Sequence, residues 1–114
     1  MADLDALLAE RTDVLARLAR LRADHAAFVA ASRDSNADDE HDPEGATIAF
    51  ERAQVEALLR EGEARLRDIE AALGRAREGG YGVCTVCGRP IDPARLAVRP
   101  SATTCVPCAS TPRR

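Results

Sequence analysis

The feature that most constrains this 114-residue chain is the spacing of its apolar residues, which alternates between three and four positions over two long stretches. In the first stretch, about residues 3–33, the spaced positions are Leu4, Leu7, Arg11, Val14, Leu18, Leu21, His25 and Phe28. In the second stretch, about residues 43–78, they are Ile48, Arg52, Val55, Leu59, Gly62, Leu66, Ile69, Leu73 and Ala76. This alternation puts an apolar stripe along one side of an α-helix and is typical of coiled coils. We therefore expect two long helices that pack through a narrow seam.

The segment between the stretches, about residues 34–41, is short and polar, which favours adjacent antiparallel helices. Asp42 suits a helix N-cap, Pro43 suits the first helical position, and Gly79-Gly80 ends the helix. The antiparallel register pairs Leu4 with Leu73, Leu18 with Leu59, Phe28 with Ile48, and His25 with Arg52. The alternative, in which the helices pair with another chain, is less favoured, and we predict a monomer.

Composition sets the size of the core. Hydrophobic residues make up 46% of the chain, but 23 of them are alanine and only 3% of the residues are aromatic. Such a chain suits slender paired helices better than a thick globular core. We predict an all-α fold, with an antiparallel coiled-coil hairpin over residues 1–79 followed by a small cysteine-containing module over residues 80–114.

Charge is unevenly distributed along the chain, although the formal net charge is only −3. Residues 34–51 carry seven acidic residues and no arginine, whereas residues 79–114 carry five arginines and one aspartate. The tip of the predicted hairpin, about residues 34–47, is therefore acidic, and the C-terminal module is basic. This distribution argues against general nucleic-acid binding by the whole chain and leaves only its last third as a candidate to touch phosphate.

The sequence has no run of about 18 apolar residues, so we expect no membrane-spanning helix and no membrane partner. Its acidic first residues lack the apolar stretch of a secretory signal, which favours a cytoplasmic protein. In a reducing compartment, four cysteines are more often metal ligands than disulfides.

The cysteines follow the pattern C-x2-C-x17-C-x2-C, through Cys84, Cys87, Cys105 and Cys108. Two thiolates separated by two residues can bind one ion from a tight turn, and Gly88 allows the first turn to close. Four thiolates fill a tetrahedral zinc site and leave no open position, which is the pattern of a structural site. We predict one structural Zn²⁺, which replaces the core that the proline-rich segment between the pairs lacks.

Two other interpretations of the cysteines are a thioredoxin-type redox pair and two disulfides. The first needs a βαβ context, which the sequence lacks, and the second needs an oxidising compartment. The sequence also shows no plausible nucleophile–base pair and no phosphate-binding loop. Because the predicted metal site is closed as well, we expect no enzyme.

A distinctive block of residues surrounds the cysteines. It comprises Gly80-Tyr81-Gly82 before the first pair, Gly88 after it, and Ile91, Arg95-Leu96, Ala97-Val98-Arg99-Pro100 and Ala102-Thr103 between the pairs. This block resembles the TraR/DksA family of bacterial transcription regulators, over about a third of the chain. The helical hairpin before it also matches the architecture of that family.

The resemblance implies a regulator that binds RNA polymerase, with no sequence-specific DNA site. Its coiled coil would enter the secondary channel of the polymerase. The regulator would modulate initiation at selected promoters, and family members often do so together with the alarmone ppGpp. The acidic residues that would approach the active centre are Asp39, Glu40, Asp42 and Glu44. Arg95 and Arg99 are candidates to contact polymerase or phosphate, and the other interpretation is that their stems cover the zinc module.

The chain departs from the family pattern at the tip, where the well-studied members carry D-x-x-D-x-A. Aligned on Asp42-Pro43, Gly45 stands in place of the second acid and Thr47 in place of the alanine. The chain ends six residues after Cys108, so it resembles a short form without the long C-terminal helix. Two alternatives remain open: an adaptor that recruits another protein, and a zinc module that binds nucleic acid through its arginines. Alarmone dependence is also left open by the sequence.

Overall fold

The computed structural model describes residues 2–34 and 43–110. Four helices follow in order: α1 (Ala2–Asp34), α2 (Pro43–Arg77), α3 (Pro93–Val98) and α4 (Val106–Ser110). The predicted all-α class is confirmed, with the two long helices in a hairpin-like arrangement. Among the described residues, the only β-type pairing is an isolated antiparallel bridge between Val83 and Pro90.

The chain divides into two compact units. One unit is Val14–Arg65, and the other combines Met1–Asp13 with Leu66–Arg114. The boundary between hairpin and cysteine module at residues 79 and 80 stays a prediction. Within the described residues, no helix is long and apolar enough to cross a membrane.

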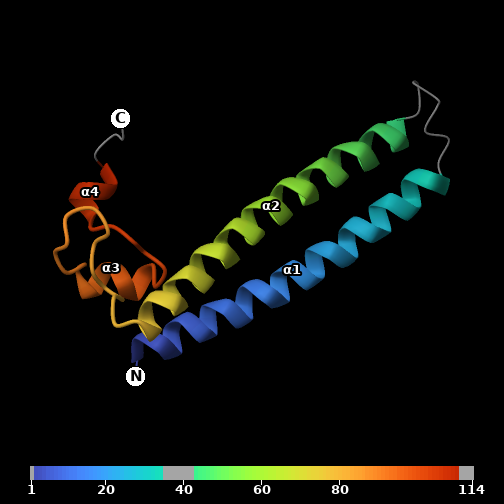
Figure 1. The fold of residues 1–114 in the computed structure, drawn as a ribbon. Helices are drawn as coiled ribbons and strands as arrows, with labels where there is room; N and C mark the ends of the chain where they lie inside the picture. Colours follow the sequence, from blue (N-terminus) through green and yellow to red (C-terminus); the bar gives the residue numbers. More distant parts are fainter. Residues whose placement is uncertain (1, 35–42, 111–114) are drawn as a thin grey trace. The chain divides into compact units, whose positions relative to one another are not determined.

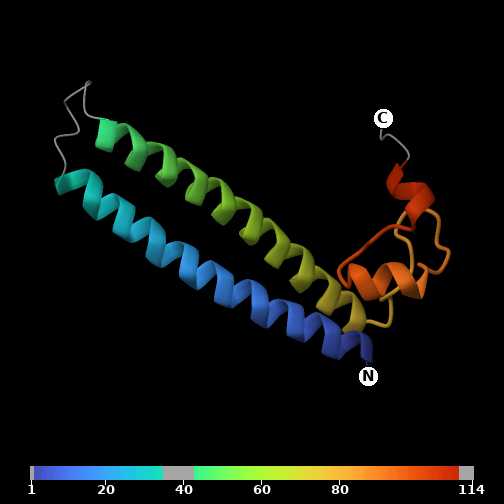
Figure 2. The ribbon, with the colours of Figure 1, turned by 180° about the vertical axis from the view of Figure 1, so that it is seen from behind.

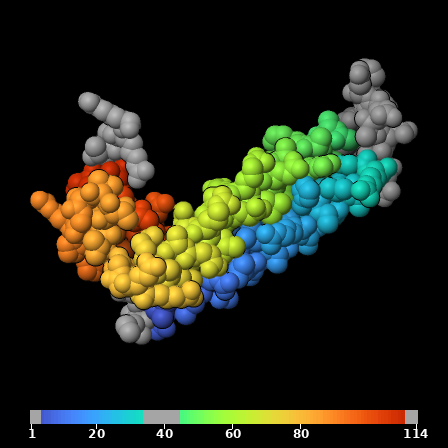
Figure 3. Space-filling view, viewed as in Figure 1, coloured from blue at the N-terminus to red at the C-terminus, as the bar shows by residue number. Residues whose placement is uncertain are grey.

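In the unit Val14–Arg65, α1 and α2 lie side by side and run antiparallel, as both ribbon views show (Figures 1 and 2). In Figure 3 the atoms of the two helices meet along the face in view. The buried residues of this unit are Val14, Leu18, Leu21 and Val55. All four are predicted seam positions, so the three–four spacing identified the packing face correctly.

Gly62 of α2 lies close to the side chain of Leu18 of α1. A Cβ atom placed on Gly62 would lie 2.7 Å from Cδ2 of Leu18, whose side chain is fully buried. A seam position that would normally carry a large side chain is thus filled from the opposite helix.

A polar layer interrupts the same seam. Nε2 of His25 lies 3.1 Å from a carboxylate oxygen of Glu56, and Nε of Arg52 lies 3.6 Å from the same oxygen. The hydrogen bond from His25, aided by the positive charge of Arg52, lowers the pKa of Glu56 below its usual value near 4.5. The predicted pairing of His25 with Arg52 therefore runs through Glu56.

In the other unit, the helical core consists of Leu7, Ile69, Ala72 and Leu73. Nε of Arg11 lies 2.7 Å from a carboxylate oxygen of Glu70, which accommodates the first polar position of the predicted seam. Leu4 was predicted to lie in the seam, but it is 37% exposed. It lies in the first turns of α1, near the end of the helix.

The C-terminus of α2 is closed by two glycines. The N–H of Gly80 donates to the carbonyl of Arg75 at 2.8 Å, and the N–H of Gly79 donates to the carbonyl of Ala76 at 3.4 Å. The φ angle of Gly79 is +82°, in the left-handed region that favours glycine. These features form a Schellman motif, which satisfies carbonyls at the helix end and turns the chain toward the cysteines.

Candidate metal centre and adjoining pocket

The first cysteine pair, Cys84 and Cys87, lies in a tight turn after α2. The N–H of Cys84 donates to the carbonyl of Arg89 at 2.8 Å, and the N–H of Gly88 donates to the carbonyl of Cys84 at 3.0 Å. Gly88 has a φ angle of +75°, where a side chain would be strained. The predicted role of Gly88 in closing this turn is confirmed.

The second pair, Cys105 and Cys108, lies at the start of α4. The N–H of Ala109 donates to the carbonyl of Cys105 at 2.9 Å, so the cysteines occupy one helical turn. The two pairs are tied to each other through the backbone, because the N–H of Thr85 donates to the carbonyl of Thr103 at 2.9 Å. This bond brings the first turn against the segment that leads into Cys105.

The four sulfur atoms converge on one point. The Sγ atoms of Cys84, Cys87, Cys105 and Cys108 all lie within 4.8 Å of one another. Those of Cys87 and Cys105 are 3.8 Å apart. Four sulfurs at the usual Zn–S distance of about 2.3 Å in a tetrahedron are separated by about 3.8 Å. The cluster therefore forms a four-cysteine zinc-finger site, and a single structural zinc fits it.

The electrostatics of the cluster agree with a cation site. Backbone N–H groups of Cys87 and Cys105 directed at the sulfur lower the pKa of Cys84 to about 6. Its hydrogen bond with Cys105, its burial and the other two cysteines raise the pKa of Cys108 to about 12. Four crowded thiols resist full ionisation without a counter-charge, which a bound divalent cation supplies. When bound, zinc would cross-link the two turns and carry out no reaction, because all its ligand positions are filled.

Helix α3 lies between the two cysteine pairs in the chain. The side chain of Asp92 accepts a hydrogen bond from the N–H of Ala94 at 2.9 Å and caps the helix. On the same helix, Nε of Arg95 donates to the carbonyl of Thr104 at 2.9 Å. The hydroxyl of Tyr81 donates to the carbonyl of Pro100 at 2.7 Å. Two side chains, Tyr81 at the start of the module and Arg95 on α3, thus bind the segment before Cys105 at Pro100 and Thr104.

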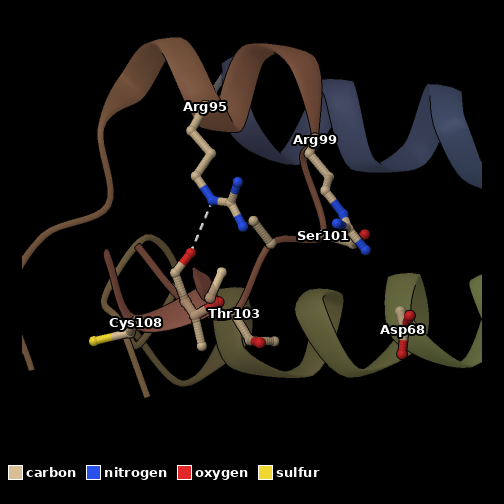
Figure 4. A pocket seen from close by; sticks show the side chains of 9 residues that line it. Asp68, Arg95, Arg99, Ser101, Thr103 and Cys108 are labelled. Atoms are coloured by element: carbon tan, nitrogen blue, oxygen red, sulfur yellow. Dashed lines mark hydrogen bonds between the residues drawn. The ribbon is translucent and has the colours of Figure 1, made fainter. Parts of the chain in front are cut away.

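A pocket of about 390 Å³ adjoins this segment. Its wall is formed by Asp68 from α2, Arg95 and Arg99 from α3 and its C-cap, Ser101, Ala102, Thr103 and Thr104 from the following segment, and Cys108 and Ala109 from α4. Figure 4 shows the guanidinium of Arg95 directed at the Thr104 carbonyl, whereas that of Arg99 lies beside Ser101. The sulfur of Cys108 points away from both arginines in this view (Figure 4).

The predicted site residues fall into three groups. The four cysteines are brought together, and the two arginines line one pocket. Asp39, Glu40 and Asp42 lie outside the described residues, and Glu44 lies in the first turn of α2.

Sequence reasoning missed Asp68, Ser101 and Thr103 as pocket residues. Asp68 carries no local signal, because it is one of many charged residues on the outer faces of the long helices. Thr103 belongs to the block of residues around the cysteines and Ser101 lies between two parts of that block, but neither was predicted to line a pocket. Only the packing of α2 against residues 99–104 reveals the three as neighbours.

Known proteins resemble the chain in both parts. Residues 79–112 match the family described as prokaryotic dksA/traR C4-type zinc finger. The structure of transcription factor DksA2 from Pseudomonas aeruginosa superimposes with a TM-score of 0.81 at 29% sequence identity, covering 94% of this chain and 77% of DksA2.

The protein YteA of Bacillus subtilis is 41% identical over 66 residues, which is 58% of this chain. The chain spans only 28% of the length of YteA. Together with the four converging sulfurs, these matches identify residues 79–112 as a prokaryotic dksA/traR C4-type zinc finger and support a TraR/DksA family member.

Proposed function

We propose that this protein is a non-catalytic transcription regulator that binds bacterial RNA polymerase in the cytoplasm. The single observation that carries the proposal is the similarity to DksA2, which extends through the helical hairpin as well as the zinc finger. On this proposal the acidic tip, residues 34–47, enters the secondary channel, and the basic module stays outside against an acidic surface.

Length and charge support this assignment. The helices α1 and α2 contain 33 and 35 residues, which corresponds to about 50 Å each at 1.5 Å per residue. Residues 34–51, which span the end of α1, the joining segment and the start of α2, carry seven acidic residues and no arginine. Carboxylates delivered to the active centre would bind its catalytic Mg²⁺ or repel nucleic acid, because Mg²⁺ prefers oxygen ligands. Asp39, Glu40, Asp42 and Glu44 are the residues proposed for this role.

The module would make the second contact. Arg99, which is exposed, is proposed to reach the polymerase surface, whereas Arg95 supports the fold of the module through Thr104. The structural zinc would keep both arginines in place, and the protein would act as a monomer.

The test is binding of the zinc-loaded protein to purified core RNA polymerase, with a photo-crosslinker at position 39. Crosslinks to the active-centre side of the channel are expected. The Asp42→Ala variant should still bind the polymerase, but its effect on the lifetime of the open complex should be weakened or abolished. Glu61→Ala, which removes an exposed acid of α2 outside the tip, is the matched control and should change neither.

Absence of binding at micromolar concentrations, with zinc content confirmed, would overturn the polymerase proposal. Capture of a different protein by the hairpin would then favour the adaptor alternative. Binding to RNA or DNA that weakens steeply with salt and depends on the arginines would favour the nucleic-acid alternative.

A further inference from the structure

The pocket beside the zinc module contains charges of both signs. Arg95 and Arg99 contribute two positive charges, and Asp68 contributes one negative charge from α2. The hydroxyl groups of Ser101 and Thr103 lie on the same wall (Figure 4). A site that only had to attract negative charge would gain nothing from a carboxylate in its wall, so the presence of Asp68 restricts the ligand.

The two arginines are not equivalent in this pocket. Nε of Arg95 is engaged by the carbonyl of Thr104 at 2.9 Å, and its side chain is half-buried. Arg99 is exposed, and its hydrogen bonds in the described part of the chain involve only its backbone: its N–H donates to the carbonyl of Arg95 at 2.7 Å, and its carbonyl accepts from the N–H of Ala102 at 3.0 Å. Within the described residues, the guanidinium of Arg99 makes no ion pair or hydrogen bond. Arg99 is therefore the group that remains available to an incoming anion.

Asp68 sets an upper limit on the charge of that anion. No ion pair joins Asp68 to either arginine across the described part of the pocket, so neither arginine neutralises its carboxylate, which is exposed and repels a ligand through a screened charge. One added negative charge neutralises the net positive charge of the three side chains. Each further negative charge is repelled by Asp68 without gaining another unengaged arginine.

We propose that this pocket binds a single carboxylate group of a protein partner, with Arg99 as its main donor. Asp68 acts as the specificity-determining residue, because it disfavours anions of higher charge such as pyrophosphate groups. A carboxylate fits the planar guanidinium in a two-point contact, and Ser101 and Thr103 can donate to its remaining lone pairs. The identity of the partner as RNA polymerase rests on the proposed function.

A protein carboxylate accounts for the pocket better than a nucleic-acid backbone does. A duplex carries a negative charge about every 1.7 Å along its axis, so a phosphate held at Arg99 brings neighbouring phosphates toward Asp68. The chain as a whole has a formal net charge of −3, which also opposes nucleic acid. A lone acidic side chain on a protein surface avoids this repulsion.

The first test compares the affinities of three zinc-loaded variants for core RNA polymerase. Arg99→Gln should weaken binding about tenfold, because it removes a charge-assisted two-point contact. Asp68→Asn should strengthen binding about threefold, since the charge that it removes is exposed and screened. Arg89→Gln is the matched control, because Arg89 is an exposed arginine of the same module outside the pocket, and it should stay within about twofold.

The opposite signs, with Asp68→Asn weaker and Arg99→Gln stronger, would overturn the proposal in favour of a basic partner group. Unchanged affinity in both variants would show that the pocket does not contact the polymerase, which would also overturn the proposal. Loss of single-stranded RNA binding in Arg99→Gln, without loss of polymerase binding, would indicate a nucleic-acid ligand instead.

The second test uses the protein alone, so it separates failure of this proposal from failure of the polymerase proposal. The NMR signal of the Arg99 Nε–H is followed during titration with acetate and with pyrophosphate, after zinc content has been checked. Wild-type protein should bind pyrophosphate no more than about threefold more tightly than acetate, whereas Asp68→Lys should gain about tenfold or more for pyrophosphate. Submillimolar pyrophosphate binding by the wild type that Asp68→Asn leaves unchanged would contradict the role of Asp68.

Discussion

The paired helices of residues 14–65 and the cysteine module of residues 80–110 are held together in different ways. The first region buries Val14, Leu18, Leu21 and Val55 along a repeating seam, where each turn of helix contributes a similar contact. The second buries only Cys84, Ile91, Ser101 and Ala102, and its remaining order comes from backbone hydrogen bonds and four sulfurs. A repeating seam loses stability in increments, whereas a module organised around one ion is either assembled or lost.

Removal of the zinc site should have the largest effect, and it should separate the two regions. Cys84→Ser, or a strong chelator, should unfold residues 80–110, because the metal supplies apparent folding free energy on the order of 10 kcal/mol in such modules. The helical circular dichroism of the long helices should largely persist. Amide NMR signals of the module and the zinc stoichiometry provide the measurement. Loss of all helical signal at the same chelator concentration would show that the two regions do not fold independently.

The next largest effect should come from the seam. Leu18 is fully buried, so Leu18→Ala should lower the free energy of unfolding by about 3 kcal/mol and leave zinc affinity unchanged. Phe50→Ala removes a side chain that is 65% exposed in the same unit, and it should change stability by less than about 0.5 kcal/mol. Urea unfolding followed by helical circular dichroism measures both.

Adding Gly62→Ala to Leu18→Ala should restore about 1 kcal/mol, since the new methyl group enters the vacated space and alanine favours the helix. Equal effects of Gly62→Ala in the presence and absence of Leu18 would contradict the close approach.

Two glycines of α2 provide a smaller and more specific test, because they should respond with opposite signs. Gly79→Ala should destabilise the helix end by about 1 kcal/mol, since Gly79 has a φ angle of +82°. Gly74→Ala should stabilise α2 by up to about 1 kcal/mol, because a Cβ there meets nothing within 4 Å. The thermal unfolding midpoints of the two variants, compared with that of the wild type, measure both effects. Effects of the same sign would be inconsistent with the Schellman motif.

The smallest effect should be the pH dependence of the polar layer. The pKa of Glu56 is lowered in the folded protein, so its contribution to stability is present above its usual pKa near 4.5 and is lost as the pH falls through the folded value. Glu56→Gln should therefore flatten the acid side of the stability curve of residues 14–65 and leave the neutral side nearly unchanged. Unfolding midpoints across the range from pH 6 to pH 3 test this. A curve identical to that of the wild type would show that Glu56 does not contribute to the loss of stability in acid.

The sequence predicted the repeating region and the metal centre for the same reason: both depend on spacing. The three–four spacing found Leu18 and Val55, and the two-residue spacing of the cysteines found the sulfurs that converge. The prediction that Leu4 is buried in the seam was wrong, because the spacing does not show where a seam becomes exposed to solvent near the end of a helix.

The pocket could not be predicted in this way. Arg95 gave no sign in the sequence that it would donate to Thr104, and Asp68 gave none that it would line the same pocket as Arg99. Those relations depend on how a long helix meets an irregular segment, for which the sequence has no period. The acidic tip residues Asp39, Glu40 and Asp42 lie outside the described structure, so their role stays a prediction.

The hydrogen bond from Arg95 to Thr104 has a thermodynamic consequence. Thr104 precedes Cys105, and Arg95 belongs to the wall that also carries Arg99, so one short segment serves both the ion and the pocket. A ligand that requires the assembled pocket binds only to the assembled module. By reciprocity, whatever factor zinc adds to the affinity of that ligand, the ligand adds to the affinity for zinc. An occupied partner surface would therefore raise the affinity for the metal, and metal depletion would weaken partner binding before the long helices are affected.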